Sequence, residues 1–409
     1  MSSKTGTSAS SSSARKAAAA PKAAPRCRHF GECGGCRLQD LPYEAQLAQK
    51  SAGLGRLFAA RGWTQLVEVH PSPEIWHYRN KMEFSFQDVY PAPPEGADNV
   101  LLGLKRKNRW DKVMSLEECH LLSPEAPKLL AAVHAWAWKE KLQPYNLHKH
   151  AGFLRHLVVR EGKNTGERLV LLVTTPGELP KESFVQAVLG SYPATTVLWG
   201  INPGKSDVAQ WEKLETLHGP GCIHETLLGR RFRISPHSFF QTNTHGAELL
   251  YTLVSDWLKG LEPSNLLDLY CGGGGIALSV AGLCKQVMGV EVVASAIEDA
   301  QFNAEENRVA NVHFVAAKVE EFLPGLAAQG VEVDTVVADP ARSGLHPAAL
   351  AALKELSPLH LLYVSCNPKA MCEDIGKLAG IFDIVRAEGV DLFPHTDHVE
   401  AAVLLRRIF

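Results

Sequence analysis

Polar and apolar positions follow two different patterns along the chain. In the front part, short stretches such as residues 78–86 (YRNKMEFSF) alternate polar and apolar side chains, which is typical of a strand with one buried face. Residues 27 to about 120 are expected to hold short strands and loops. Residues 99–116 favour a hairpin with a basic tip, and residues 123–142 favour a helix that begins near Pro124. Residues 154–162 and 167–175 favour two more strands. The front part therefore predicts an α+β domain.

From about residue 226 the pattern changes to short apolar runs that alternate with helical stretches such as 294–309. The apolar runs are residues 266–269, 287–290, 313–316, 335–338 and 361–365. Near-continuous apolar strands between helices favour a parallel, doubly wound sheet. The predicted fold class is α/β, with a low-complexity tail (1–26), an α+β domain (27–225) and a Rossmann-like domain (226–409).

The composition fits a globular chain of two or three domains, because 45% of the 409 residues are hydrophobic and 21% are charged. No apolar run approaches the roughly 18 residues of a membrane span, so we expect no membrane partner. Residues 1–170 hold 25 Lys and Arg against 16 Asp and Glu, whereas residues 171–409 hold 17 against 28. A basic front half suits an anionic partner such as RNA.

The first 26 residues are rich in Ser and Ala and carry five Lys or Arg and no acid. Such a segment cannot form a core and is expected to be disordered. The same composition also fits an organelle transit peptide. We therefore expect a cytoplasmic protein, or one of a plastid or mitochondrion if this segment is a transit peptide.

A glycine run follows the first apolar strand of the second half, in NLLDLYCGGGGIALSVAG (265–282). Glycines let the backbone approach a ligand closely, and the helix after them presents free N–H groups. The next strand ends in Glu291, 23 residues after Asp268, where an acid binds the ribose of an adenosine cofactor. The loop lacks the G-x-x-x-x-G-K-[ST] spacing and a strict G-x-G-x-x-G. This favours S-adenosylmethionine (SAM) over a dinucleotide, with a simple turn as the alternative.

Three reactive side chains stand at strand ends near this loop. Asp339 follows residues 335–338 and would either cap the next helix or face the cofactor. Cys366 follows residues 361–365, at the edge where such sheets bind ligands. A thiolate there suits C5-methylation of a pyrimidine, because its addition to C6 makes C5 nucleophilic. A base must then take the C5 proton. Glu400, at the start of the last apolar strand, is the candidate, with a solvated strand-entry residue as the alternative.

The nine cysteines are an odd number in a long chain without a secretory signal, which argues against a disulfide scaffold. Cys27, Cys33 and Cys36 cluster in CRHFGECGGCRLQ (27–39), and Cys119 follows in SLEECHLL. Four thiolates can hold zinc or an iron–sulfur cluster. The spacing alone leaves the metal open.

Five motifs, in order, resemble those of the RNA 5-methyluridine methyltransferases, SAM-dependent enzymes that act on uridines of tRNA and 23S rRNA. The motifs are SFFQTN (238–243), LDLYCG (267–272), DPARSG (339–344), VSCNP (364–368) and FPHTDHVE (393–400). The resemblance runs from residue 27 to the end of the chain. It implies Cys366 as the nucleophile and Glu400 as the base that takes the C5 proton. It also implies SAM contacts from Gln241, Tyr270, Glu291 and Asp339.

The cysteine pattern is similar to the [4Fe–4S] sites of the rRNA-modifying members of this family. The resemblance therefore implies a [4Fe–4S] cluster held by Cys27, Cys33, Cys36 and Cys119, and it favours a uridine of 23S-type rRNA as the substrate. A tRNA uridine is the alternative, because the catalytic motifs are shared. An RNA-binding chaperone without required methyl transfer is an alternative of another class.

Two features depart from the family pattern. Lys318 stands where the family usually has Asp or Asn near the adenine, and lysine can only donate hydrogen bonds. Members often carry an N-terminal small β-barrel that binds RNA, which we do not expect here, so the front domain should hold the RNA. Its hairpin 103–112 is the expected phosphate contact, because it combines Trp110 with Lys105, Arg106, Lys107 and Arg109. We expect a monomer.

Overall fold

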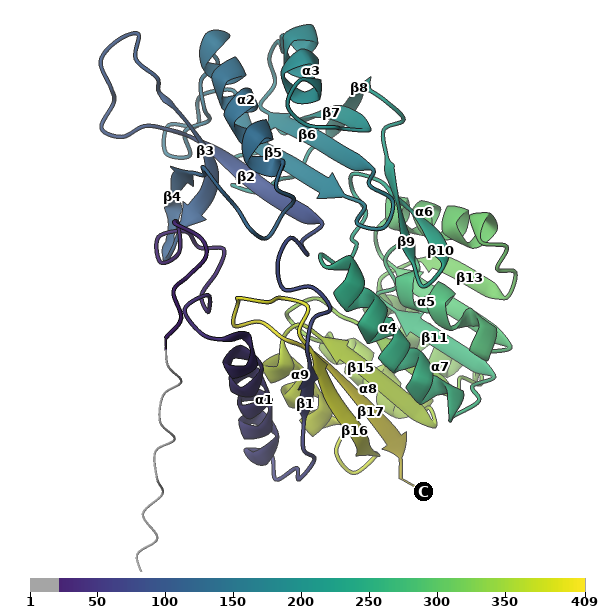
Figure 1. Cartoon of the computed structure of the whole chain (residues 1–409). Helices are drawn as coiled ribbons and strands as arrows, with labels where there is room; N and C mark the ends of the chain where they lie inside the picture. Colours follow the sequence, from purple (N-terminus) through teal and green to yellow (C-terminus); the bar gives the residue numbers. More distant parts are fainter. Residues whose placement is uncertain (1–21, 409) are drawn as a thin grey trace, which may run out of the picture.

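The computed structural model describes residues 22–408. The predicted tail (1–26) lies outside this range except for residues 22–26, which form no helix or strand. A seven-stranded front sheet lies above an eight-stranded C-terminal sheet in the view of Figure 1. No helix among residues 22–408 is long and apolar enough to cross a membrane.

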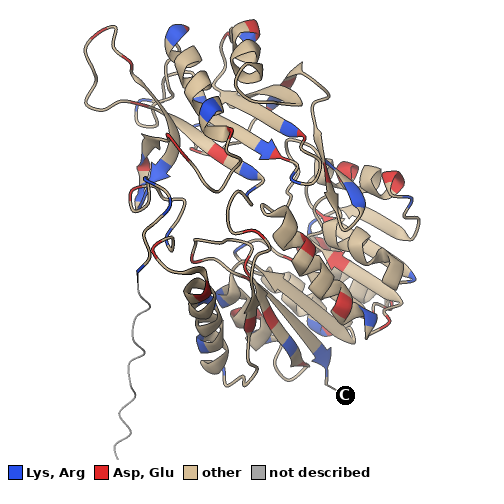
Figure 2. Cartoon of the chain, in the orientation of Figure 1, with Lys and Arg blue, Asp and Glu red and all other residues tan. Residues whose placement is uncertain are grey.

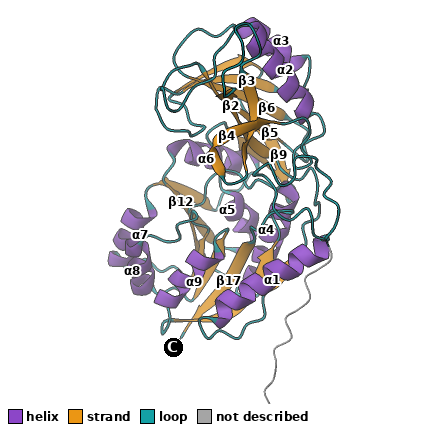
Figure 3. Cartoon of the chain, turned by 90° about the vertical axis from the view of Figure 1, so that its left-hand side faces the viewer, coloured by secondary structure: helices purple, strands orange, loops and turns teal. Residues whose placement is uncertain are grey.

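The front sheet has the strand order β4-β3-β2-β5-β6-β7-β8. Its strands are β2 (Lys81–Asp88), β3 (Val100–Arg106), β4 (Arg109–Ser115), β5 (Leu154–Glu161), β6 (Arg168–Thr174), β7 (Thr196–Ile201) and β8 (Lys213–His218). The helices α2 (Ala126–Lys139) and α3 (Lys181–Leu189) cover one face of this sheet, at the top of Figure 3. The strands and the helix predicted here are confirmed.

The opposite face of the front sheet divides into an apolar and a polar part. Apolar side chains of β5, β6 and β7 pack against a hairpin formed by β9 (Ile223–Leu227) and β10 (Arg230–Ile234). Along β2, by contrast, Met82, Phe84 and Phe86 face the helices, so the residues between them face the other way. The residues that β2 presents on this polar part are Lys81, Glu83, Ser85 and Gln87, of which Ser85 is buried.

The C-terminal sheet has the strand order β1-β16-β17-β15-β14-β11-β12-β13. Its strands are β1 (Glu68–His70), β11 (Asn265–Leu269), β12 (Gln286–Glu291), β13 (Val312–Ala316), β14 (Thr335–Ala338), β15 (His360–Ser365), β16 (Phe382–Val390) and β17 (Glu400–Arg407). The five strands predicted from apolar runs are β11 to β15, and they pair in parallel as expected. β17 runs antiparallel to both of its neighbours.

Helices cover both faces of this sheet. They are α4 (Thr244–Lys259), α5 (Gly275–Val280), a short 3₁₀ helix (Ala281–Leu283), α6 (Ala294–Glu306), α7 (Val319–Ala328), α8 (Pro347–Leu356) and α9 (Pro368–Lys377). Buried residues of α7, α8 and α9 form one apolar core with the sheet, and those of α4 and α5 form another. The prediction of a doubly wound α/β fold is therefore confirmed.

The interpretation of residues 27–120 as short strands and loops is wrong at residues 43–59, which form the helix α1 (Tyr43–Ala59). Its buried stripe is Gln46, Lys50, Leu54 and Phe58, at a spacing of four residues. Because two of these side chains are polar, no apolar stripe marks the helix in the sequence. Leu54 and Phe58 pack in the core that α7, α8 and α9 share.

The front of the chain thus contributes to the C-terminal sheet. β1 pairs in parallel with β16, with His70 opposite Val390, and α1 lies beside β1 (Figure 1). The predicted boundary between residues 225 and 226 does not separate the two sheets, because these two elements precede it. The segment that carries α1 and β1 is tied instead to the last loop of the chain.

The tie is a buried ion pair between α1 and the loop that joins β16 to β17, residues 391–399. Lys50 Nζ lies 2.6 Å from Asp391 Oδ1, and the two side chains are 2% and 0% exposed. Lys50 also donates to the carbonyl of Phe393 (3.1 Å), and the Tyr43 hydroxyl donates to Asp391 (3.0 Å). The His395 N–H donates to Gln46 Oε1 (2.9 Å). Both polar residues of the α1 stripe therefore hold this loop.

We predict that Lys50→Met destabilises the protein by about 3–5 kcal/mol, because it leaves the Asp391 carboxylate buried without its cation. Denaturant unfolding measures the change. Arg56→Met, on the exposed side of the same helix, is the matched control and should stay within about 0.5 kcal/mol of the parent. Equal effects of the two substitutions would contradict a stabilising role of the buried pair.

Candidate functional site

The candidate site lies at the carboxyl edge of the C-terminal sheet. β11 pairs with β12 on one side and with β14 on the other, so the strand order reverses at β11 and a crevice opens at its end. Ala401 of β17 lies opposite Ser365 of β15 in an antiparallel pair. Glu400, the first residue of β17, therefore stands at the same edge as Cys366, which follows β15. The structure brings the predicted nucleophile and the predicted base together.

Cys366 is a partly exposed thiol that lies near both negative and positive side chains. Burial, followed by the charge of Glu400, raises the pKa of Cys366, whereas a hydrogen bond and the positive charge of Arg342 lower it. Asn367 donates to the carbonyl of Arg342 (2.7 Å) and so ties the loop after β14 to the loop after β15. Arg342 is thus the cation that can stabilise the Cys366 thiolate.

Glu400 is a buried carboxylate with spare acceptor capacity. Its side chain is almost wholly buried, and its Oε1 has no hydrogen-bond partner among the described residues. Burial and then the charge of Asp339 raise the pKa of Glu400 well above its usual range, against the effect of Arg342. A carboxylate with a raised pKa is a stronger base than an exposed one, which suits it to accept a proton near neutral pH.

Asp339 and Gln241 form the second pair at this edge. Gln241 Nε2 donates to Asp339 Oδ2 at 3.2 Å. Desolvation raises the pKa of Asp339 to about 7, although the bond from Gln241 lowers it. Asn80, just before β2, donates to the carbonyl of Gln241 (2.8 Å) and to Thr244 Oγ1 (2.9 Å). The front sheet thereby begins directly beside this pair.

The glycine run after β11 forms an open backbone cradle. Gly272 and Gly274 have φ angles of +53° and +83°, which side-chain-bearing residues rarely adopt. A Cβ at Gly274 would lie 2.9 Å from the Phe314 ring. At the end of β12, Glu291 accepts the N–H groups of Gly272 (3.3 Å) and Val293 (2.9 Å). The acid is therefore held at the cradle, where a ribose would lie.

Asp268, the last residue but one of β11, is a buried acid next to the cradle. One carboxylate oxygen accepts the N–H of Ala277 (2.9 Å), and the other has no partner among the described residues. Burial raises the pKa of Asp268 to about 8, with further contributions from Asp339 and Glu291. Several acceptor groups around a glycine cradle fit a cationic adenosine cofactor such as SAM.

The two remaining positions beside the predicted cofactor are engaged within the protein. Tyr270 is half-buried at φ +64°, and its hydroxyl accepts the backbone N–H of His346. Lys318 Nζ lies 2.7 Å from Glu321 Oε1, and both side chains are more than half exposed. The departure from the family pattern at Lys318 thus forms a surface ion pair at the start of α7.

The four predicted metal-binding cysteines line one small pocket, together with apolar side chains such as Leu104 and Leu116. All four are free thiols. Burial raises the pKa of Cys33 to about 11 and that of Cys36 to about 12, and neighbouring cysteines add to both. Four converging sulfur atoms fit a thiolate-bound metal chemically. However, within residues 22–408 no group of three or more His, Cys, Asp or Glu side chains is arranged to hold an ion. The [4Fe–4S] cluster stays a prediction.

The basic hairpin β3–β4 is less free to bind phosphate than its sequence indicates. Figure 2 marks Lys and Arg along it, but three of the four predicted cations have carboxylate partners. The pairs are Lys105–Asp207 (2.5 Å), Arg106–Glu32 (3.0 Å) and Arg109–Asp111 (2.8 Å). Trp110 is 71% exposed, as a base-stacking residue would be.

The reversed strand order, the glycine cradle and Glu291 at the end of β12 are typical of an α/β protein that binds an adenosine cofactor. The thiol of Cys366 and the carboxylate of Glu400 lie at the same edge of the sheet as candidate catalytic groups. Comparison with known proteins is consistent with this class. Residues 227–408 match the family model described as tRNA (Uracil-5-)-methyltransferase. An uncharacterized RNA methyltransferase of Clostridium tetani is 37% identical over 389 residues, which are 93% of this chain and 84% of that protein.

Two further similarities extend over most of the chain. An uncharacterized RNA methyltransferase of Nanoarchaeum equitans is 33% identical over 383 residues, 93% of this chain and 80% of that protein. The crystal structure of Pyrococcus abyssi tRNA (uracil-54, C5)-methyltransferase in complex with S-adenosyl-L-homocysteine has a TM-score of 0.74 and 32% identity, and the match covers 91% of this chain and 85% of that chain. The chain belongs to the RNA (uracil-5-)-methyltransferase family and is an RNA methyltransferase.

Sequence reasoning singled out Cys366, Glu400 and Asp339 but missed Arg342 and Asp268. Both missed residues lie inside motifs that were recognised, DPARSG and LDLYCG. No spacing rule marks them, because their importance comes from the charges that surround them in space.

We predict that Arg342→Met slows alkylation of Cys366 by iodoacetamide and moves its pH profile to higher pH. The thiolate is the reactive form, and the substitution removes the group that lowers the thiol pKa. Peptide mass spectrometry at several pH values follows Cys366 alone. Lys354→Met, on the exposed face of α8, is the control. An unchanged profile in Arg342→Met would show that the guanidinium does not stabilise the thiolate.

Proposed function

We propose that this chain transfers a methyl group from SAM to C5 of a uridine in RNA through a covalent adduct between Cys366 and C6 of the uracil. The observation that carries the proposal is the meeting of a thiol, a buried carboxylate and Arg342 beside the glycine cradle. C5 of uracil is a weak nucleophile until a group adds at C6. The family membership favours this enzyme over the non-enzymatic RNA chaperone.

Cys366 starts the reaction as the thiolate that Arg342 stabilises. Its sulfur forms a bond to C6, and the electron pair of the C5–C6 double bond moves into the enolate of the ring. SAM, when bound, supplies the methyl group that C5 takes, and leaves as S-adenosylhomocysteine. Gln241, Glu291 and Asp339 are the residues proposed to hold it, and Tyr270 supports the loop from which the cradle begins.

Glu400 completes the reaction by taking the proton from C5. The electrons of that C–H bond restore the C5–C6 double bond, the C6–S bond breaks, and Cys366 returns to the thiolate. The unpartnered Oε1 of Glu400 and its raised pKa suit this step. The uracil must leave its base stack to reach the crevice.

Different observations favour the two candidate RNA species. The cysteine pattern favours 23S-type rRNA, whereas the similarity over most of the chain to an enzyme described as acting on tRNA uracil-54 favours a tRNA uridine. Incubation with methyl-deuterated SAM and separated tRNA and rRNA fractions, followed by nucleoside mass spectrometry, decides between them. Labelled 5-methyluridine in neither fraction would contradict the proposed function.

We predict that Glu400→Gln traps the methylated RNA on the protein, because the C5 proton stays in place and the C6–S bond cannot break. Turnover should fall by about 100-fold or more, and a denaturing gel should show an RNA adduct on unmodified substrate RNA. Cys366→Ala should form neither adduct nor 5-methyluridine. Glu388→Gln, a carboxylate of β16 paired with His70, is the control. Release of product by Glu400→Gln at the parent rate would exclude it as the base.

We also propose that Cys27, Cys33, Cys36 and Cys119 hold a [4Fe–4S] cluster with a structural role. A bound metal would stabilise the thiolate forms, which burial and then their mutual repulsion disfavour in this pocket. The cluster would join the N-terminal loop to the segment after β4 and takes no part in methyl transfer.

We predict that protein purified without oxygen contains iron and sulfide in equal amounts, and that Cys33→Ser loses both. Cys284→Ser, a thiol outside the pocket, should keep them. Metal analysis and visible absorbance provide the readout independently of activity. Zinc without sulfide in the parent protein would overturn the cluster assignment.

A further inference from the structure

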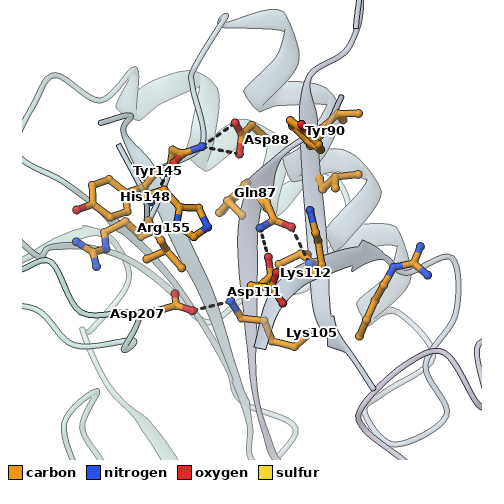
Figure 4. Close-up of a pocket in the computed structure, with 17 residues that line it drawn as sticks. Gln87, Asp88, Tyr90, Lys105, Asp111, Lys112, Tyr145, His148, Arg155 and Asp207 are labelled. Atoms are coloured by element: carbon orange, nitrogen blue, oxygen red, sulfur yellow. Dashed lines mark hydrogen bonds and ion pairs between the residues drawn. The ribbon is translucent and has the colours of Figure 1, made fainter. Parts of the chain in front are cut away.

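A second pocket, here called the front pocket, opens at the far end of β2 from the active site. It lies between β2, β3 and β4 on one side and the segments around Tyr145 and Asp207 on the other (Figure 4). Its cavity of about 380 Å³ falls in the size range of small-ligand sites. No step of the proposed methyl transfer uses it.

Aromatic rings and cations form its walls. Tyr90 is 83% exposed, and Lys112 Nζ lies 5.1 Å from the centre of its ring. On the other wall, the Arg155 guanidinium lies 4.3 Å from the centre of the Tyr145 ring. Figure 4 shows Tyr145, His148 and Arg155 facing Tyr90 and Lys112 across Gln87. Tyr145 is buried, so Tyr90 is the exposed ring of the pair. An exposed ring beside a cation is an element with which proteins bind unstacked nucleotides.

Arg155 gives the pocket a fixed, buried cation. Its side chain is 3% exposed, and its guanidinium donates to the carbonyls of Asn202, Gly204 and Ser206. Its Nε has no hydrogen-bond partner among the described residues. Arg155 therefore belongs to the wall of the pocket and not to the exposed surface.

The charges of the pocket separate a phosphate side from a base side. The carboxylates of Asp207 and Asp111 are balanced by Lys105 and Arg109, whereas Lys112 has no ion pair among the described residues and is free to bind phosphate. Among the described residues, the Asp88 carboxylate accepts from the Asn146 amide alone, at 3.0 and 3.3 Å. An ionised carboxylate can only accept hydrogen bonds, so its remaining capacity suits an exocyclic amino group of a base.

The polar face of β2 connects this pocket with the active site. The strand starts after Asn80, which is bonded to the Gln241 carbonyl, and ends at Gln87 and Asp88 in the pocket wall. Between them, Lys81 and Glu83 are at least partly exposed on the polar face, and Ser85 is buried. Seven residues of a strand span roughly 20 Å, a distance that a few nucleotides of unstacked RNA can cover.

We propose that the front pocket binds one unstacked nucleotide of the RNA whose uridine occupies the active site, and that it prefers a base with an exocyclic amino group. The base stacks on Tyr90 and donates its amino group to Asp88, and Lys112 binds the adjoining phosphate. This inference rests on the proposed function, because it takes RNA as the ligand of both sites.

Fluorescence anisotropy with labelled oligocytidylate and oligouridylate of about twelve nucleotides tests the pocket. The two pyrimidines match in size and differ in the amino group. Asp88→Ala should weaken binding of oligocytidylate and leave oligouridylate unchanged. Tyr90→Ala should weaken binding of both by about fivefold or more, and Lys112→Ala should weaken both and reduce the logarithmic salt slope by about 0.7.

Lys139→Ala and Trp138→Ala, exposed on α2 over the opposite face of the front sheet, are the matched controls and should bind as the parent does. If Tyr90→Ala or Lys112→Ala unfolds at a lower temperature than the parent, Tyr90→Leu or Lys112→Gln replaces it in the binding measurement. Pocket variants that behave like the α2 controls would overturn the proposal, as would equal loss of both oligonucleotides in Asp88→Ala.

Methyl transfer by the parent protein to cellular RNA is measured in parallel. If the parent protein methylates RNA but the pocket variants bind both oligonucleotides as the parent does, the proposal for the front pocket is wrong and the proposed function stands. Absence of transfer to any RNA rejects the proposed function, whatever the oligonucleotides show.

Discussion

The buried Lys50–Asp391 ion pair is the interaction on which the rest of the arrangement depends. The ion pair fixes the start of the 391–399 loop, and the residue directly after that loop is Glu400. A free charge at either position would be costly in so buried a place, so the pair holds only while α1 and the loop stay together. The helix α1, near the start of the chain, thereby holds the loop that precedes Glu400, the proposed base.

The same loop connects the thiol pocket with the active site. The N–H groups of Arg37 and Leu38, directly after Cys36, donate to the His395 carbonyl at 2.8 and 3.0 Å. Trp76 stacks on the His395 ring with 3.7 Å between the ring centres. Whatever orders the cysteines therefore also orders the approach to Glu400. This gives the proposed metal site a structural role in an enzyme whose proposed chemistry needs no redox step.

The parts of the fold that the sequence predicts are those with a simple repeating signal. The five parallel strands β11 to β15 appear as apolar runs because helices cover both faces of their sheet, although β13, at its edge, is only partly buried. The helix α1 was missed because Gln46 and Lys50 occupy its buried stripe, and β1 because it has only three residues. The hairpin cations were taken for phosphate contacts, since their carboxylate partners Glu32 and Asp207 come from remote segments.

The site divides in the same way. Cys366 follows from its place at a strand end, whereas residue chemistry alone left Glu400 between a base and a solvated residue. Only the family motif favoured the base, and the antiparallel register of β15 and β17 places Glu400 at the same edge as Cys366. Arg342 could not be found in advance, because its effect depends on the surrounding charges.

The most direct test of the account uses RNA that contains 5-fluorouridine. Fluorine at C5 cannot leave as a proton does, so the adduct should persist after denaturation in the presence of SAM. After digestion with nuclease and protease, we expect the peptide that carries Cys366 to be heavier by one modified nucleotide. The Cys366→Ala protein should show no such adduct. An adduct on another cysteine, or methylated RNA without any adduct, would contradict the covalent mechanism.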